Sequence, residues 1–162
     1  MATLTVLKFS NPTGAEQMLE KMQALQKSQL IKIQDAAIVS WPEGRKAPKT
    51  KQAVNLAAMG ALDGAFWGML FGLIFFIPLF GLAIGAAMGA LSGKMSDYGI
   101  DDDFIKKTRE QVTEGTSALF LMTSDAVQDK VFEELKGFKF ELIASNLTKE
   151  QEEQLMAAFS AE

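Results

Sequence analysis

The chain contains no cysteine and no histidine among its 162 residues. Without cysteine it has no disulfides and no thiol chemistry. Without histidine it lacks the usual general base near neutral pH and the commonest ligand of transition metals. A histidine-dependent catalytic triad and a histidine-ligated metal site are therefore excluded from this chain alone. We expect neither an enzyme nor a bound cofactor or metal.

An excess of positive charge is also missing, because 16 basic residues stand against 20 acidic ones and the net charge is −4. This balance gives no indication of a nucleic-acid partner. The length suits one domain, or one small domain with an insertion. The main apolar run begins too deep in the chain for a cleaved signal peptide, and the first ten residues have no basic-then-apolar pattern.

Charge is absent altogether from residues 64–93, a run of thirty, whereas both flanks are charged and look like a soluble protein. Glycines recur at every fourth position there, in two series separated by Pro78: Gly60, Gly64, Gly68, Gly72, Gly81, Gly85, Gly89 and Gly93. A glycine inside a helix costs about 1 kcal/mol relative to alanine, so this regular spacing indicates a role in packing.

A step of four residues turns a helix by about 400°, so each glycine series forms a stripe along one helix. Such stripes let helices approach closely in lipid. The alternative is a tightly packed helix pair inside a soluble core. We favour lipid, because a domain of 162 residues is too small to cover so apolar a run. Its large aromatic residues are Phe66, Trp67, Phe71, Phe75, Phe76 and Phe80.

A hairpin that turns near Pro78 is the arrangement we favour for this run. A continuous helix of thirty residues would be about 45 Å long, against about 30 Å for a hydrocarbon core, and would put the two flanks on opposite sides of the membrane. In a hairpin the first stripe faces the second, which pairs Gly64, Gly68 and Gly72 with Gly81, Gly85 and Gly89. Each arm has only 14 or 15 uncharged residues. Both a spanning pair and a re-entrant wedge therefore stay open.

Basic residues on both sides of the run predict that both flanks are cytoplasmic. Lys106, Lys107 and Arg109 follow the run. The basic residues closest to it also fit a site for anionic lipid headgroups, or serve only as a topology signal. These are Arg45, Lys46, Lys49, Lys51 and Lys94.

The N-terminal flank predicts a strand, a helix and a strand. Residues 3–9 are rich in strand formers, and residues 31–41 form a second strand with an irregularity near Asp35. The helix between them begins at Asn11 with Pro12, or at a capping box of Thr13 and Glu16. Its apolar face consists of Met18, Leu19, Met22 and Leu25. Residues 42–52 break the pattern with prolines and basic side chains.

The C-terminal flank repeats this order. A short capped helix over residues 100–112 precedes a buried strand over residues 117–123. A helix over residues 124–137 carries Val127, Val131 and Leu135 and ends at Gly137, followed by a strand over residues 138–144. Gly115 marks a turn. The last helix is capped by Thr148 and Gln151 and carries Leu155 and Phe159.

Neither flank alone is large enough to bury a good core. Together they predict an α+β fold, a four-stranded sheet with two helices on one face in the ferredoxin-like split βαβ arrangement, interrupted by the membrane-inserted glycine-zipper hairpin. The corresponding segments are residues 1–48, 49–97 and 98–162.

A few polar or aromatic residues stand out as candidate sites. Asp63 fits an ion path, although its position also fits the headgroup level at the start of the first arm. The acids of the sequence IDDDF lack the spacing of a calcium loop, and capping of a helix by Asp101 or Asp102 is the better interpretation. Trp67 and Tyr98 are candidate interfacial anchors, and Trp67 suits packing against a neighbouring subunit equally well.

Several segments carry a family resemblance: ALDGAFWGMLFGLIFFIPLFGLAIGAAMGALSGKMSDYGIDDDFIK, EGTSALFLM and KVFEELKGF. They resemble the bacterial membrane-protein family known as domain of unknown function 1269, over nearly the whole chain. The resemblance implies a prokaryotic membrane-associated protein with a central glycine-rich segment. It implies no activity and no catalytic residues.

The function we expect is that of a non-enzymatic, homo-oligomeric protein of the bacterial inner membrane, with its soluble domain and both termini in the cytoplasm. Its glycine-zipper hairpin would organise, shape or seal membrane, with lipids and other copies of the chain as partners. One alternative is an oligomeric channel or transporter with Asp63 near the pore. Another is a membrane-anchored sensor that binds a small ligand or a partner protein, an idea that rests on fold analogy.

Overall fold

The computed structural model describes residues 3–46, 48–52, 64–75, 93, 95–124 and 128–159. In this part of the chain, five strands form one antiparallel sheet in the order β3-β2-β4-β1-β5. The strands are β1 (Thr3–Phe9), β2 (Lys32–Trp41), β3 (Lys49–Gln52), β4 (Thr116–Ser124) and β5 (Glu141–Asn146). The helices are α1 (Gly14–Lys27), α2 (Gly64–Phe75), α4 (Asp102–Gln111), α5 (Gln128–Glu134) and α6 (Lys149–Phe159).

The sheet is shared between the two flanks of the chain. Strand β4, from the C-terminal flank, lies between β1 and β2 of the N-terminal flank, and β5 pairs with the outer edge of β1. The two units β1-α1-β2 and β4-α5-β5 therefore interleave, and neither forms a sheet alone. The prediction of a mixed α and β domain built from both flanks is confirmed.

The predicted number of strands is wrong by one. Residues 42–52 were expected only to break the pattern, yet Lys49–Gln52 pairs with β2 over Ala37–Ser40 as strand β3. The lysines of this short strand suit an edge position, because charged side chains at a sheet edge discourage pairing with other chains.

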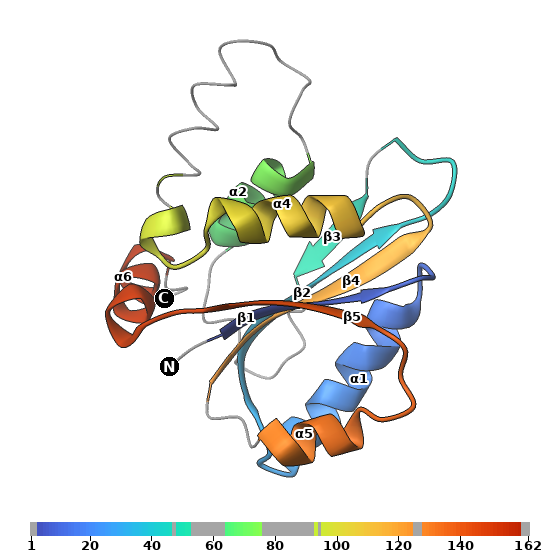
Figure 1. Ribbon diagram of the computed structural model, residues 1–162, viewed down its shortest axis with the longest axis horizontal. Coiled ribbons are helices and arrows are strands. Elements are labelled where there is room, and N and C mark those ends of the chain that lie inside the picture. Colours follow the sequence, from blue (N-terminus) through green and yellow to red (C-terminus); the bar gives the residue numbers. More distant parts are fainter. Residues whose placement is uncertain are drawn as a thin grey trace.

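Helices cover both faces of the sheet (Figure 1). Helices α1 and α5 lie on one face, and α2, α4 and α6 lie on the other. Two apolar clusters fill the spaces between these layers. Because successive side chains of a strand point to opposite faces, β4 contributes Leu119 and Leu121 to the α1 face and Ala118, Phe120 and Met122 to the α2 face.

Several local predictions are confirmed. Strand β1 has the predicted bounds, and the register between β2 and β4 shifts between Ile33 and Asp35. The Asp101 side chain caps α4 by accepting a hydrogen bond from the Phe104 N–H at 2.9 Å. Thr148 and Gln151 form the reciprocal capping bonds at the start of α6, at 2.9 and 3.1 Å.

Other boundaries differ from the prediction. Thr13 precedes α1 but makes no side-chain capping bond; instead the Asn11 Oδ1 accepts from the Thr13 N–H at 3.0 Å. The predicted box with Glu16 is therefore wrong, because the hydroxyl of Thr13 donates to Asn11 as well. The residues observed in α5 and β5 are Gln128–Glu134 and Glu141–Asn146, so the strand begins three residues later than predicted.

The largest correction concerns the start of the uncharged run. Helix α2 lies against the sheet, where Phe66 is 0%, Trp67 3% and Phe71 4% exposed. The expectation that the domain is too small to cover these aromatic side chains is wrong for this helix, because the sheet together with α4 and α6 covers them. Among the described residues, no helix combines the length and the apolar character that crossing a membrane requires. Residues 76–92 lie outside the described part of the chain.

Candidate functional site

A buried carboxylate joins α2 to the sheet. Asp35 is 1% exposed and lies in β2, just after the register shift. Its Oδ1 accepts a hydrogen bond from the Ala36 N–H at 2.8 Å, and its Oδ2 accepts one from the Trp67 Nε1–H at 3.1 Å. Because a buried polar group needs hydrogen-bonding partners, this bond gives the indole of Trp67 a fixed place on the sheet.

Aromatic rings surround this contact. The ring of Trp67 stacks on that of Phe71, with centroids 5.8 Å apart, and meets that of Phe66 edge-on at 5.0 Å. Phe120 of β4 meets both Trp67 and Phe71 edge-on, at 6.4 and 5.0 Å. Edge-on and offset-stacked pairs add to the stability that burial alone supplies. Trp67 therefore packs within its own domain, and the prediction that it anchors at a membrane interface or contacts another subunit is wrong.

The guanidinium of Arg109 in α4 binds the last turn of α2. Its Nε donates to the Ile74 carbonyl at 3.1 Å, and its Nη2 donates to the Leu73 carbonyl at 2.7 Å. The last four carbonyls of a helix have no N–H partner within the helix, and α2 is described as far as Phe75. Arg109 thus donates to two carbonyls of this last turn, and a cation there suits the helix dipole.

The same end of α2 contacts the basic turn between β2 and β3. Phe75 meets Trp41 edge-on, with centroids 6.1 Å apart, and the Trp41 Nε1–H donates to the Arg45 carbonyl at 2.8 Å. The side chains of Arg45, Lys46 and Lys49 are exposed. Residues 42–52 contain four basic side chains and a single acid, Glu43. A positively charged turn therefore lies beside the last residue of α2.

The predicted packing glycines are placed only in part. Gly64, Gly68 and Gly72 lie in α2, and Gly93 is exposed. A Cβ atom added to Gly72 would meet no described atom within 4 Å, nor would one on Gly93. The described structure therefore shows no close contact that requires glycine at these two positions. The remaining predicted site residues outside the described part are Gly60, Asp63, Pro78, Gly81, Gly85, Gly89 and Lys94.

Two further predictions concern the basic and aromatic candidates. Lys51 belongs to β3, and Tyr98 packs partly buried against the apolar cluster under α2 and α4. Because Asp63 is outside the described part, an ion path through it stays a prediction. The pairing of the two glycine stripes stays a prediction as well, because Gly81, Gly85 and Gly89 of the second stripe also lie outside that part. Asp35 and Arg109 were not singled out as site residues. An isolated acid within the apolar sequence IKIQDAAIV is the signal that points to Asp35.

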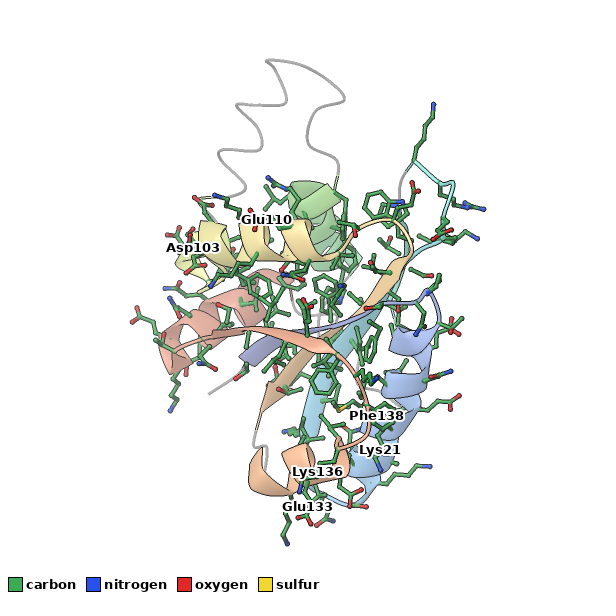
Figure 2. All side chains as sticks on the ribbon, turned by 45° about the vertical axis from the view of Figure 1, so that its right-hand side comes forward. Lys21, Asp103, Glu110, Glu133, Lys136 and Phe138 are labelled. Carbon is green, nitrogen blue, oxygen red and sulfur yellow. The ribbon has the colours of Figure 1, made fainter. Side chains whose placement is uncertain are left out.

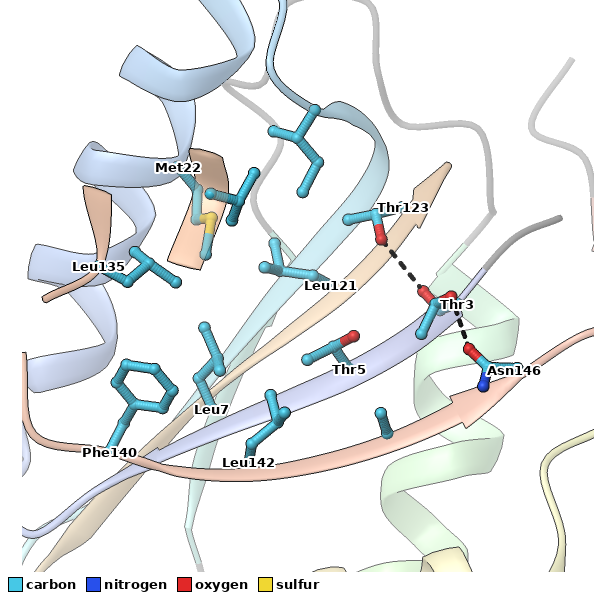
Figure 3. Close-up of a pocket in the computed structure, with 13 residues that line it drawn as sticks. Thr3, Thr5, Leu7, Met22, Leu121, Thr123, Leu135, Phe140, Leu142 and Asn146 are labelled. Carbon is cyan, nitrogen blue, oxygen red and sulfur yellow. Dashed lines mark hydrogen bonds between the residues drawn. The ribbon is translucent and has the colours of Figure 1, made fainter. Parts of the chain in front are cut away.

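The opposite face of the sheet contains a pocket of about 270 Å³ (Figure 3). Its floor comes from β1, β4 and β5, and its walls come from α1 and from the segment around α5. Most lining side chains are apolar: Leu7, Met22, Ile31, Leu121, Val131, Leu135, Phe140, Leu142 and Ala144. Four are polar and uncharged: Thr3, Thr5, Thr123 and Asn146.

Incomplete cover by helices explains this pocket. Helix α5 has seven residues and is about 10 Å long, whereas the six residues of β5 extend about 20 Å. Leu142 is consequently 50% exposed on the edge strand β5, and Phe138, in the segment before this strand, is 36% exposed. Sequence reasoning missed the pocket, although the alternation Phe138, Phe140, Leu142 and Ala144 places apolar side chains on one face.

Figure 2 labels charged side chains at both ends of the molecule. Asp103 and Glu110 project from α4, whereas Glu133 and Lys136 lie at the α5 end of the molecule. There Lys21 of α1 makes an ion pair with Glu134 of α5 at 3.0 Å, between partly exposed side chains. An exposed pair of this kind adds little stability, so the apolar cluster between α1 and the sheet carries most of the packing on this side.

Comparison with known proteins identifies a family and nothing more specific. No curated protein and no solved structure matches the chain. Residues 61–160 match the family described as "Protein of unknown function (DUF1269)". This match includes α2, α4, α5, α6 and the strands β4 and β5. Since it covers more than half of the 162 residues, the chain belongs to this family of proteins of unknown function.

Proposed function

We propose that this protein is a non-enzymatic membrane protein whose α/β domain is held at the cytoplasmic face of the bacterial inner membrane. The observation that carries the proposal is the composition of the chain around the last residue of α2. There, Phe75 contacts Trp41, whose indole binds the turn that presents Arg45 and Lys46. Residues 76–92, which follow directly, are 17 uncharged residues. Because α2 before them and Met95 after them pack in one cluster on the same face of the sheet, such a segment would enter and leave the membrane on one side, as a re-entrant turn.

The basic turn has a defined role in this proposal. Anionic headgroups attract basic side chains with about 1 kcal/mol each near the membrane surface. Arg45, Lys46 and Lys49 would contact lipid where the uncharged segment enters it. The ferredoxin-like arrangement of β1-α1-β2 and β4-α5-β5 serves as the rigid body that carries this turn, and the bond from Trp41 to Arg45 limits its movement.

Vesicle flotation tests the membrane contact. The purified full-length protein is mixed with phosphatidylglycerol or phosphatidylcholine vesicles and compared with the triple variant Arg45→Glu, Lys46→Glu and Lys49→Glu. The matched control reverses the exposed residues Lys130, Lys136 and Lys139 at the α5 end, with the same change in net charge. We expect the first variant to lose binding to phosphatidylglycerol vesicles and the control to keep it. Equal binding by both variants would contradict the proposal.

Self-association through the glycine series is the second part of this proposal, and it gives the protein its role in organising, shaping or sealing membrane. Close packing of helices in lipid depends on small residues at the contact. We expect Gly85→Leu to dissociate the oligomer in mild detergent, whereas Ala86→Leu, one position off the stripe, leaves it intact. Light scattering coupled to size-exclusion chromatography measures both. If the Gly85→Leu variant keeps an unchanged oligomer, the proposed role of the glycine zipper in self-association is contradicted.

A membrane-anchored sensor is the second candidate function, and the 270 Å³ pocket favours it. Binding sites for small molecules are largely apolar with a few placed polar groups, and this pocket has that composition. The pocket opens on the face of the sheet opposite α2, so a ligand there would not compete with the contacts of the basic turn. A channel that uses Asp63 has no comparable support among the described residues.

A further inference from the structure

We propose that the pocket between α1, α5 and the sheet binds an uncharged small molecule with an apolar body and one hydrogen-bonding end. The inference deepens the sensor function proposed above and rests on it. It depends on three properties of the pocket: the absence of charge among its lining side chains, the polar row at one end and the volume of the apolar remainder.

The described residues that line the pocket include no aspartate, glutamate, lysine or arginine. A charged ligand would therefore lose its hydration without gaining an ion pair, and the cost of burying an unpaired charge is large. An apolar ligand with neutral polar atoms avoids this cost. The lining thus selects against carboxylates, phosphates and amines.

The polar end of the pocket is one row across three neighbouring strands. In the antiparallel register, Thr3 of β1 stands between Thr123 of β4 and Asn146 of β5. The Thr3 hydroxyl donates to Asn146 Oδ1 at 2.9 Å, and the Thr123 hydroxyl donates to the Thr3 carbonyl at 3.5 Å (Figure 3). Because the Asn146 oxygen accepts from Thr3, the amide N–H groups of this exposed side chain can donate to a ligand that carries an accepting oxygen.

Beyond this row, Thr5 is the one polar side chain among the described lining residues, and the others are apolar. Thr5 stands between Leu121 and Ala144, and Leu7 lies beside Leu142. A volume of 270 Å³ corresponds to about nine water molecules at about 30 Å³ each, so the pocket suits a molecule of about ten non-hydrogen atoms. A straight-chain alcohol of eight carbons combines this size with a single hydroxyl and is a suitable probe.

The test uses the full-length protein in lipid nanodiscs, with methionine methyl groups labelled for NMR. Met22 lines the pocket, whereas Met95 and Met122 belong to the cluster on the opposite face of the sheet. We expect 1-octanol to shift the Met22 signal saturably without shifting the other two. Shortening the alcohol should weaken binding by about fourfold per methylene, the change expected from the transfer of apolar surface.

Octanoate at pH 8 is the charged comparison, and we expect it to bind at least tenfold more weakly than 1-octanol. Equal affinity for the alcohol and the carboxylate would overturn the ligand class. An unshifted Met22 signal at saturating 1-octanol would overturn the binding site itself.

Two variants locate the ligand. Ala144→Phe fills the pocket and should abolish the Met22 shift, whereas Ala157→Phe, the same change at an exposed position of α6, should preserve it. Asn146→Leu removes the amide at the polar end and should weaken octanol binding about fivefold, the equivalent of one hydrogen bond. Unchanged binding by Ala144→Phe would contradict the assignment.

Vesicle flotation separates this inference from the membrane proposal. Ala144→Phe should float with phosphatidylglycerol vesicles like the unmodified protein, because the pocket lies on the face of the sheet away from the basic turn. If the Arg45, Lys46 and Lys49 variant floats normally while 1-octanol still shifts Met22, the membrane proposal fails and the ligand class stands. If flotation depends on the basic turn and the Met22 signal never shifts, the membrane proposal is supported and the ligand proposal fails.

Discussion

The two faces of the sheet are covered in different ways. On one face, α2, α4 and α6 bury a cluster that includes Phe66, Phe71 and Phe120, each at most 4% exposed. On the other face, α1 and the seven-residue α5 leave a pocket of about 270 Å³ and a half-exposed Leu142. The same strands supply side chains to both faces, so the difference arises from the helices.

This comparison shows what the start of the uncharged run does. The residues of α2 that look most like a membrane segment form the well-packed layer of the domain. Polar contacts complement that layer, through Asp35 to Trp67 and through Arg109 to the end of α2. The α1 face contains ordinary soluble-protein sequence and is the one with unfilled space. Hydrophobicity along the chain therefore does not by itself distinguish core from membrane.

The largest expected effect compares one substitution on the two faces. Phe120→Ala should lower the free energy of unfolding by about 3–5 kcal/mol, because the ring is fully buried against Trp67 and Phe71. Phe140→Ala, at a half-buried ring that lines the pocket, should cost less than half of that. Urea unfolding followed by circular dichroism measures both. Equal losses would mean that the two faces are packed equally well.

Removal of the guanidinium at the end of α2 should have the next largest effect. Arg109→Ala leaves the carbonyls of Leu73 and Ile74 without these donors and should cost about 2 kcal/mol. Hydrogen exchange should accelerate in α2 and stay unchanged in α1. Lys107→Ala, at an exposed position of the same helix, is the control. A uniform acceleration across both helices would show that Arg109 stabilises the whole domain and not the α2 layer in particular.

The hydrogen bond of the buried Trp67 indole can be compared with that of the Trp41 indole. Trp67→Phe keeps an aromatic ring but removes the hydrogen bond to Asp35, and it should cost about 1–2 kcal/mol. Trp41→Phe removes the bond to the Arg45 carbonyl at an exposed site and should cost less than 1 kcal/mol. Thermal unfolding of the two variants gives the ranking. A reversed ranking would exclude the Asp35 contact as a major link between α2 and the sheet.

The smallest effect concerns the glycine stripe. A methyl group at Gly72 meets no described atom within 4 Å, so Gly72→Ala should stabilise the protein by up to about 1 kcal/mol through helix propensity. Gly14→Ala should destabilise it instead, because its Cβ would lie 2.5 Å from the Cβ of Phe9. Unfolding experiments distinguish the two signs. If Gly72→Ala dissociates an oligomer, a partner helix approaches this position and the glycine zipper extends into α2.

Local patterns predicted most of the elements correctly. Strand-forming residues located β1 and β2, a continuous apolar run located β4, and short polar motifs located the starts of α4 and α6. Strand β3 was missed because its sequence, KTKQ, has no apolar pattern and becomes a strand only by pairing with β2. The first residues predicted for β5 instead lie before the strand, although Phe140 still lines the pocket.

The candidate sites depended more heavily on distant contacts. The hydrogen bonds from Arg109 to the α2 carbonyls join residues that are 35 and 36 positions apart in the sequence. The bond from Trp67 to Asp35 joins residues that are 32 positions apart. The row of Thr3, Thr123 and Asn146 unites three strands from both flanks. No sequence window contains these pairs, because they exist only once the strands have found their register.

By itself, the sequence determined the order of strands and helices in both flanks, the lack of histidine and cysteine chemistry, and the need for the flanks to share one core. It determined these because periodicity, capping and composition act over a few residues. The tertiary structure alone decided that α2 lies on the sheet and that α5 leaves the opposite face partly open. Both results depend on which surfaces contact each other and on how much area each helix covers. Neither can be read from the order of residues along the chain.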